Sequence, residues 1–189
     1  LSNITKDWMK KTLEGVSELI AHNGLKFDLV CLKLFGVLDY EVGYLGKPDL
    51  IFGKEVKITD TLIWSRLFNP DRRGGHSLEA WGKRLGDFKD DFRQQSIELG
   101  LIESTSEKGS EFKQYSDLMV SYCVQDTNVT SKWYKHLEVE WLSYKGWHKA
   151  EKLENKLADL AVRRQTYGFK FNKDYAIECL QDLTEKMEI

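Results

Sequence analysis

Apolar residues recur at helical spacing near the N-terminal end of the chain. This series predicts a helix over 6–20, which then runs into a short buried strand that ends near Asn23. Gly24 predicts a turn at that point, and the helical pattern resumes over 27–38. We therefore expect Asp28 in the first turn of a helix that follows a strand.

Glycine and proline residues between 43 and 53 predict a loop before the next regular element. The sequence of 56–60 is typical of a second short strand. Thr59 or Asp60 can cap a helix expected over 61–68.

A further helix is expected over 78–85, with Ser77 as its N-cap and Gly86 closing its C-terminal end. His76 precedes this helix, and we interpret it as a local hydrogen-bonding residue, not as a ligand. Three tryptophans are expected in the core: Trp64, Trp81 and Trp133. Two others fit either the core or a contact between domains: Trp141 and Trp147.

One or two helices are predicted over 112–137. The residues expected on their buried side are Tyr115, Leu118, Met119, Tyr122, Cys123, Val129, Trp133 and Leu137. Tyr122 and Asp126 are four residues apart, which places them on the same face of a helix, one turn from each other. This spacing suits a catalytic pair.

The pattern changes after residue 145. We expect a long amphipathic helix over 147–164, a turn over 167–172 and another helix over 176–187. We therefore divide the chain into a first domain, 1–145, and the start of a second, 146–189.

Composition narrows the class of protein only moderately. With 41% hydrophobic residues the chain can form a core, and no apolar run reaches the roughly 18 residues of a membrane span. Its 28 basic and 30 acidic residues give a net charge of −2, so charge alone does not indicate nucleic-acid binding. Three widely spaced cysteines suggest neither a disulfide framework nor a zinc site, which favours a reducing cytoplasm.

Two aspartates in distant helices suggest metal chemistry. Asp28 and Asp126 are the kind of residues that converge at one end of the sheet in an open α/β fold, where ligands bind. Two divalent metal ions can activate a water and stabilise a leaving oxygen in phosphodiester cleavage. Several converging carboxylates are needed to hold such ions, and two aspartates do not suffice.

Two motifs and the segment between them resemble a known family. The run His22-Asn23-Gly24-Leu25-Lys26-Phe27-Asp28 resembles the second motif of DnaQ-like (DEDD) proofreading exonucleases, and Tyr122-x-x-x-Asp126 resembles their third motif in its tyrosine-bearing form. The segments 60–67 and 75–86 are similar to family A DNA polymerases of T-seven-like phages. The order and separation of these segments make the match specific.

The resemblance implies an RNase H-like α/β exonuclease fold, followed by helices that lead into a polymerase domain. It implies an enzyme, the 3′→5′ proofreading exonuclease of a phage-encoded DNA polymerase, which uses two Mg²⁺ or Mn²⁺ ions. Asp126 would bind the metal on the nucleophile side, Asp28 would hold the second metal, and Tyr122 would orient the attacking water. Asn23 would hydrogen-bond near the terminal nucleotide or brace the site, and Phe27 would pack beneath the site.

The family's first motif, Asp-x-Glu on the first strand, has no counterpart in this sequence. We therefore expect an N-terminally truncated domain with an exposed sheet edge and with very weak or no exonuclease activity on its own. Its partners would be the 3′ end of single-stranded DNA, or a primer terminus, and the polymerase domain of the same parent chain. The expected location is the cytoplasm of a bacterial host, with no membrane contact.

Two alternatives stay open. A catalytically dead relative could still bind single-stranded DNA or serve as a structural platform for the polymerase. A stand-alone DnaQ-like ribonuclease would use the same carboxylates on RNA.

Overall fold

The computed structural model describes residues 2–43, 46–87 and 91–187. They form two compact units, of which the first ends at Asp159 and the second begins at Leu160. Helix α7 (Trp147–Tyr167) crosses this division, and its first half is packed onto the first unit. The identity of 1–145 and 146–189 as parts of two domains stays a prediction.

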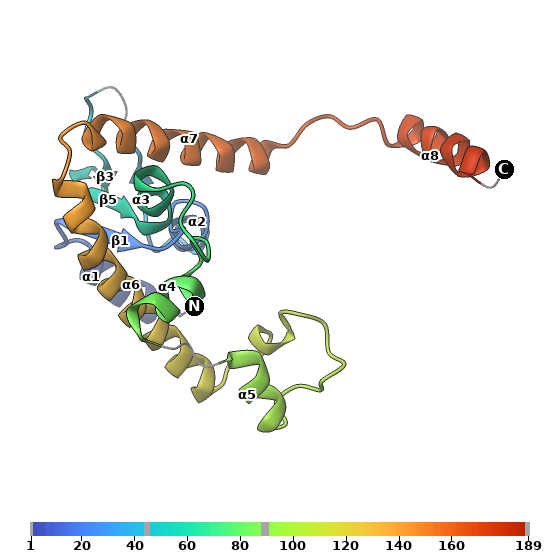
Figure 1. Cartoon of the computed structure of the whole chain (residues 1–189), viewed down its shortest axis with the longest axis horizontal. Coiled ribbons are helices and arrows are strands. Elements are labelled where there is room, and N and C mark those ends of the chain that lie inside the picture. Colours follow the sequence, from blue (N-terminus) through green and yellow to red (C-terminus); the bar gives the residue numbers. More distant parts are fainter. Residues whose placement is uncertain (1, 44–45, 88–90, 188–189) are drawn as a thin grey trace. The chain divides into compact units, whose positions relative to one another are not determined.

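The strands form two small sheets in the first unit. Strands β1 (Glu18–Ala21) and β5 (Lys57–Asp60) are parallel neighbours, with Ala21 opposite Asp60 (Figure 1). Three short strands form the second, antiparallel sheet: β2 (Tyr40–Glu41), β3 (Leu50–Ile51) and β4 (Lys54–Glu55). The described part of the chain is therefore α/β, with more helix than strand.

Strand β1 has an open edge. Among the described residues, β5 is the one strand that pairs with β1. All four residues of β1 are partly exposed, whereas three of the four residues of β5 are buried. The exposed sheet edge expected from the sequence is thus present in the described part of the fold.

Helices surround the parallel strands, and local sequence signals set the ends of several of them. Their bounds are α1 (Asn3–Leu13), α2 (Asp28–Leu34), α3 (Thr61–Phe68), α4 (Leu78–Leu85), α5 (Phe92–Glu98), the 3-10 helix η1 (Ser110–Phe112), α6 (Asp117–Leu142) and α8 (Lys173–Met187). The predictions for α3 and α4 are confirmed, including side-chain caps by Asp60 and Ser77 and a left-handed Gly86.

The helix predicted over 6–20 is wrong in its second half. Helix α1 ends at Leu13, and β1 begins at Glu18. Gly15 lies in the connection, where the conformational freedom of glycine disfavours a continuing helix. The strand predicted after this helix is present, but pairing with β5 makes the chain extended from Glu18, earlier than the helical spacing indicates.

Two hydrophobic clusters form the core of the first unit. One joins α2, the strands and α7 through buried residues that include Leu29, Ile58 and Ala158. The other joins α3, α4 and α6 through Trp64, Trp81, Trp133 and Leu137, each no more than 1% exposed. The core positions predicted for these three tryptophans are confirmed.

The buried side of α6 is shorter than predicted. Val129, Trp133 and Leu137 are buried, but Cys123 is exposed and Tyr115 is 77% exposed. Tyr115 lies before the start of α6, and the residues of α6 that pack in the core with α3 and α4 are Trp133 and Leu137, in its later turns. The prediction that Tyr115 and Cys123 are buried is therefore wrong.

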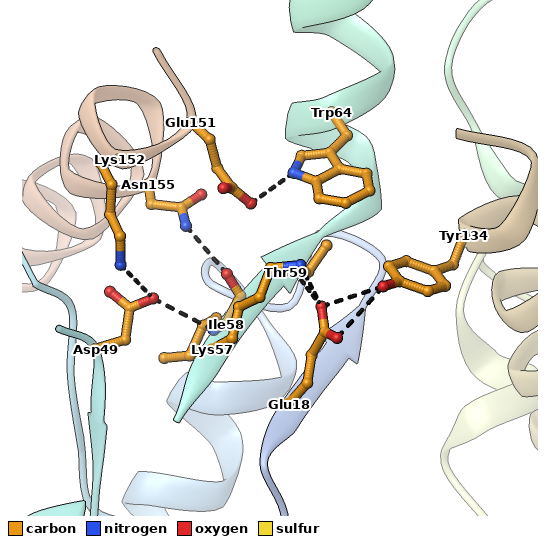
Figure 2. A network of polar contacts seen from close by, with 10 residues as sticks. All are labelled: Glu18, Asp49, Lys57, Ile58, Thr59, Trp64, Tyr134, Glu151, Lys152 and Asn155. Carbon is orange, nitrogen blue, oxygen red and sulfur yellow. Dashed lines mark hydrogen bonds and ion pairs between the residues drawn. The ribbon is translucent and has the colours of Figure 1, made fainter. Parts of the chain in front are cut away.

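Polar side chains fix the first half of α7 to strand β5. Figure 2 shows Asn155 Nδ2 donating to the Ile58 carbonyl (3.2 Å) and Asp49 Oδ2 accepting from the Ile58 N–H (3.2 Å). Lys152 Nζ lies 3.0 Å from the same Asp49 oxygen. Asp49 and Asn155 thus occupy the backbone N–H and carbonyl of Ile58 in β5.

The second unit consists of the end of α7 and helix α8. The apolar residues of α8 are exposed: Tyr175, Ile177, Leu180, Leu183 and Met187. Across 2–43, 46–87 and 91–187, no helix combines the length and the apolar character needed to cross a membrane.

Candidate functional site

The turn between β1 and α2 brings the first group of predicted site residues to the end of the parallel strands. Asn23 has a left-handed backbone conformation, with φ of 58°. A Cβ added at Gly24 would overlap the Cβ of Ala21, so no larger residue fits there without a shift of the backbone. The tight approach at Gly24 thus directs the chain into α2 immediately after the strand.

Asp60 holds this turn in place. Its Oδ1 accepts hydrogen bonds from the N–H groups of Asn23 (3.0 Å) and Leu62 (3.0 Å), and its Oδ2 accepts from the N–H of Leu25 (3.3 Å). Asp60 is 2% exposed. Desolvation raises the pKa of this carboxyl, while the backbone N–H groups act in the opposite direction.

The sequence predicts that Asp60 can cap α3, but it does not predict that Asp60 also binds the turn at Asn23. Asp60 was predicted as a cap of α3, which uses one carboxylate oxygen. The second oxygen of a buried carboxylate also needs a donor, because an unpaired buried acceptor is costly. That requirement is the signal that could have indicated a second partner for Asp60.

Asp28 and Asp126 lie close enough to influence each other. Asp28 is in the first turn of α2, as predicted, and Asp126 is in α6. Desolvation raises the pKa of Asp28, and the negative charge of Asp126 raises it further. The fold therefore brings together two predicted carboxylates that are almost a hundred residues apart in sequence.

Tyr122 lies one turn before Asp126 on α6 and makes aromatic contacts. Its ring centroid is 4.8 Å from that of Phe92 in α5 and 6.0 Å from that of Phe112 in η1. The α5–η1 segment thus contributes to the position of this tyrosine. Its expected action on a water stays a prediction.

Asn23 and Phe27 line a hollow of about 380 Å³ beside the turn. The other residues around it are His22, Leu62, Arg66, His76 and Ser77. Phe27 is 63% exposed, so its ring is not part of the core, and the expectation that it packs beneath the site stays a prediction. The residue is the N-cap of α2 and lines the hollow.

His76 is held by local hydrogen bonds, as its sequence context predicts. Its Nδ1 lies 2.8 Å from Ser65 Oγ, and its Nε2 lies 3.0 Å from the carbonyl oxygen of Pro70. Trp81 Nε1 donates to the same Ser65 Oγ (3.1 Å). A single tautomer satisfies this chain, with the imidazole proton on Nε2 and the Ser65 hydroxyl donating to Nδ1.

Asp28 and Asp126 are the residues that the sequence predicts as metal ligands. The residues that the structure describes contain no cluster of three or more His, Cys, Asp or Glu side chains arranged to hold an ion. Asp28 and Asp126 form a pair of carboxylates whose mutual repulsion a divalent cation would relieve. Two carboxylates are too few to hold two ions by themselves.

Comparison with known proteins indicates a similarity to phage polymerases. The chain is 31% identical over 134 aligned positions to the DNA-directed DNA polymerase of Escherichia phage T7, and the match covers 59% of the chain. The DNA-directed DNA polymerase of Enterobacteria phage T3 matches to the same extent. The matched region spans 18% of the length of each of these relatives. No protein-family profile matches the chain.

Proposed function

We propose that the chain forms part of the 3′→5′ proofreading exonuclease of a phage-type DNA polymerase, with an RNase H-like fold. One observation carries the proposal: Asp28 and Asp126 come from distant helices and lie close enough that the charge of Asp126 raises the pKa of Asp28. A pair of carboxylates in this relation is typical of a functional site. The similarity to the two phage polymerases supports a role in DNA replication.

In this proposal Asp28 and Asp126 hold a divalent cation, Mg²⁺ or Mn²⁺. The ion, when bound, supplies activation of a water and stabilisation of the leaving 3′ oxygen. Tyr122 positions that water from one turn away on α6. Asn23 contacts the terminal nucleotide, and the exposed ring of Phe27 offers a surface on which a base can stack.

The substrate would be the 3′ end of single-stranded DNA. Residues 146–189 would open the polymerase region of the same parent chain. Hydrolysis with two metal ions requires carboxylates in addition to Asp28 and Asp126, so we expect very weak or no cleavage by this chain alone.

A second candidate is a part of the polymerase that binds single-stranded DNA, or supports the polymerase structurally, without cleaving DNA. The small donor set favours it, because within the described residues no group of three metal-ligating side chains gathers.

The experiment that tests both candidates uses the purified chain with a 5′-labelled single-stranded DNA in Mg²⁺ or Mn²⁺. Binding of Mn²⁺, followed by electron paramagnetic resonance, is measured in parallel for the wild type, Asp28→Asn and Asp126→Asn. Shortening of the DNA from its 3′ end that Asp126→Asn abolishes would support the exonuclease. Mn²⁺ binding that either variant weakens, without cleavage, would support an incomplete exonuclease site.

Retention of DNA without any Mn²⁺ binding at Asp28 and Asp126 would favour the binding platform. Absence of both DNA binding and Mn²⁺ binding would overturn both candidates. An RNA of the same sequence, degraded in preference to the DNA, would instead favour a DnaQ-like ribonuclease.

A further inference from the structure

Two hollows meet beside the candidate carboxylates. The hollow that contains Phe27 adjoins a second one of about 360 Å³, and both are lined by Asn23, Leu62 and Arg66. Each volume falls in the range of roughly 300–1,000 Å³ that is common for small-molecule sites. Both hollows thus reach the turn that precedes Asp28, at Asn23.

Arg66 stands between the two hollows. It is an exposed residue in the last turn of α3, four residues after Leu62 and therefore on the same face of that helix. Asp60, the N-cap of α3, also binds the turn that carries Asn23. One carboxylate thus fixes the helix of Arg66 relative to Asn23.

Arg66 supplies the positive charge of the first hollow. Both histidines there have local partners, since His22 Nδ1 lies 3.3 Å from Thr61 Oγ1 and His76 bonds to Ser65 and Pro70. Among the described residues that line it, Arg66 carries the fixed charge.

The second hollow is lined by Arg66, by a second cation, Lys26, and by the exposed carboxylate of Glu154. Asp60 also lines this hollow, but backbone N–H groups already bind both of its oxygens. The second hollow therefore offers two cationic side chains against one exposed carboxylate.

A phosphodiester strand that approaches Asp28 meets the negative charges of two carboxylates. A cation that lines the same hollow as Asn23 would compensate for that repulsion and fix the strand. The guanidinium group suits this task because its planar fork donates two parallel hydrogen bonds to a phosphate.

We propose that Arg66 binds a backbone phosphate of a single-stranded nucleic acid whose 3′ end lies at Asp28, and so positions the strand for the site. Arg66 is a positioning residue in this role, because it does not touch the reacting atoms. The inference rests on the proposed function, since it takes the strand and its direction from there.

The experiment measures binding of a fluorescein-labelled oligo(dT) to the full chain by anisotropy at several salt concentrations. Arg66→Ala is expected to weaken binding about tenfold at low salt, as for the loss of a charge-assisted hydrogen bond. It should also make the plot of log K against log salt shallower by about 0.7, the contribution of one phosphate in single strands. Arg66→Lys keeps the charge and should retain the wild-type slope with a smaller loss of affinity.

Lys11→Ala is the matched control, because it removes one exposed positive charge from α1 and lines neither hollow. It should bind like the wild type. Equal affinity and slope for Arg66→Ala and the wild type would overturn the role of Arg66 and leave the proposed function intact. Failure of the wild type itself to bind the oligonucleotide would contradict the proposed function and, with it, this inference.

Discussion

Glu151 allows a test of how the first half of α7 is fixed to the core. The side chain is 3% exposed, and its Oε1 accepts a hydrogen bond from Trp64 Nε1 (2.6 Å). Burial raises the pKa of Glu151 from its ordinary 4.5 to about 7, although the Trp64 bond and the charges of Lys57 and Lys152 oppose this rise; Asp49 adds to it.

The protonated form also has an available acceptor. Asn155 lies one turn after Glu151 on α7, and its Oδ1 is buried without a hydrogen-bond partner. Figure 2 shows that the amide oxygen of Asn155 and the carboxyl group of Glu151 are on the same side of the helix. A neutral Glu151 can therefore donate its proton toward Asn155, whereas an ionised one cannot.

The sign of the pH dependence follows from the raised pKa. The folded state binds the Glu151 proton more tightly than the unfolded state, so its contribution to the free energy of unfolding is complete below about pH 4.5. This contribution is lost as the pH rises from about 4.5 through about 7. At about 1.4 kcal/mol for each pKa unit, the loss amounts to roughly 3 kcal/mol.

Glu151→Gln removes the titration but keeps an oxygen for Trp64 and an amide that can donate to Asn155. We expect the variant and the wild type to have similar stability near pH 4.5, and the variant to be more stable by up to roughly 3 kcal/mol at pH 8. Urea unfolding followed by tryptophan fluorescence between pH 4.5 and 8 measures this difference.

Glu154 is exposed on the same helix, so Glu154→Gln is the control. Its stability relative to the wild type should be the same at pH 4.5 and at pH 8. A difference between Glu151→Gln and the wild type that is the same at pH 4.5 and pH 8 would refute the reasoning. A variant that is less stable than the wild type at pH 8 would refute it as well.

Three further predictions concern the turn and the carboxylate pair. Asp126→Asn should lower the pKa of Asp28, as measured by NMR titration. The pKa should stay above its ordinary value because desolvation persists. An unchanged pKa would show that the two groups do not interact. Gly24→Ala should destabilise the protein by about 1–3 kcal/mol in thermal unfolding because its Cβ overlaps Ala21, and Gly15→Ala, where the space is open, is the control for overlap. Asp60→Ala should leave three N–H groups without their acceptor and lower stability by at least about 1–3 kcal/mol, with faster amide exchange in the turn; slow exchange there would contradict its role.

Local signals allowed much of the helical structure to be predicted. The caps Asp60 and Ser77 and the left-handed Gly86 act within one turn of their helices, so they can be read from neighbouring residues. The end of α1 could not be read in this way, because the following residues become a strand only through pairing with β5.

In the candidate site, too, some features follow from neighbouring residues and others depend on the tertiary fold. The first-turn position of Asp28 followed from the strand, the glycine and the resumed helical pattern. Its closeness to Asp126 depends on how α6 packs on the core, which periodicity does not encode. It was expected from the general arrangement of open α/β folds and from a family resemblance. The link from Asp60 to Asn23 spans 37 residues in sequence and was not foreseen.

The parallel sheet can grow in one direction only. On the β5 side, Asp49 and Asn155 already occupy the N–H and carbonyl of Ile58, so a new strand would have to displace both side chains. On the β1 side, the described fold offers no such competitor. Any strand that extends this sheet, in a complex or by self-association, would therefore meet it at β1, and a parallel one would end next to the turn that leads to Asp28.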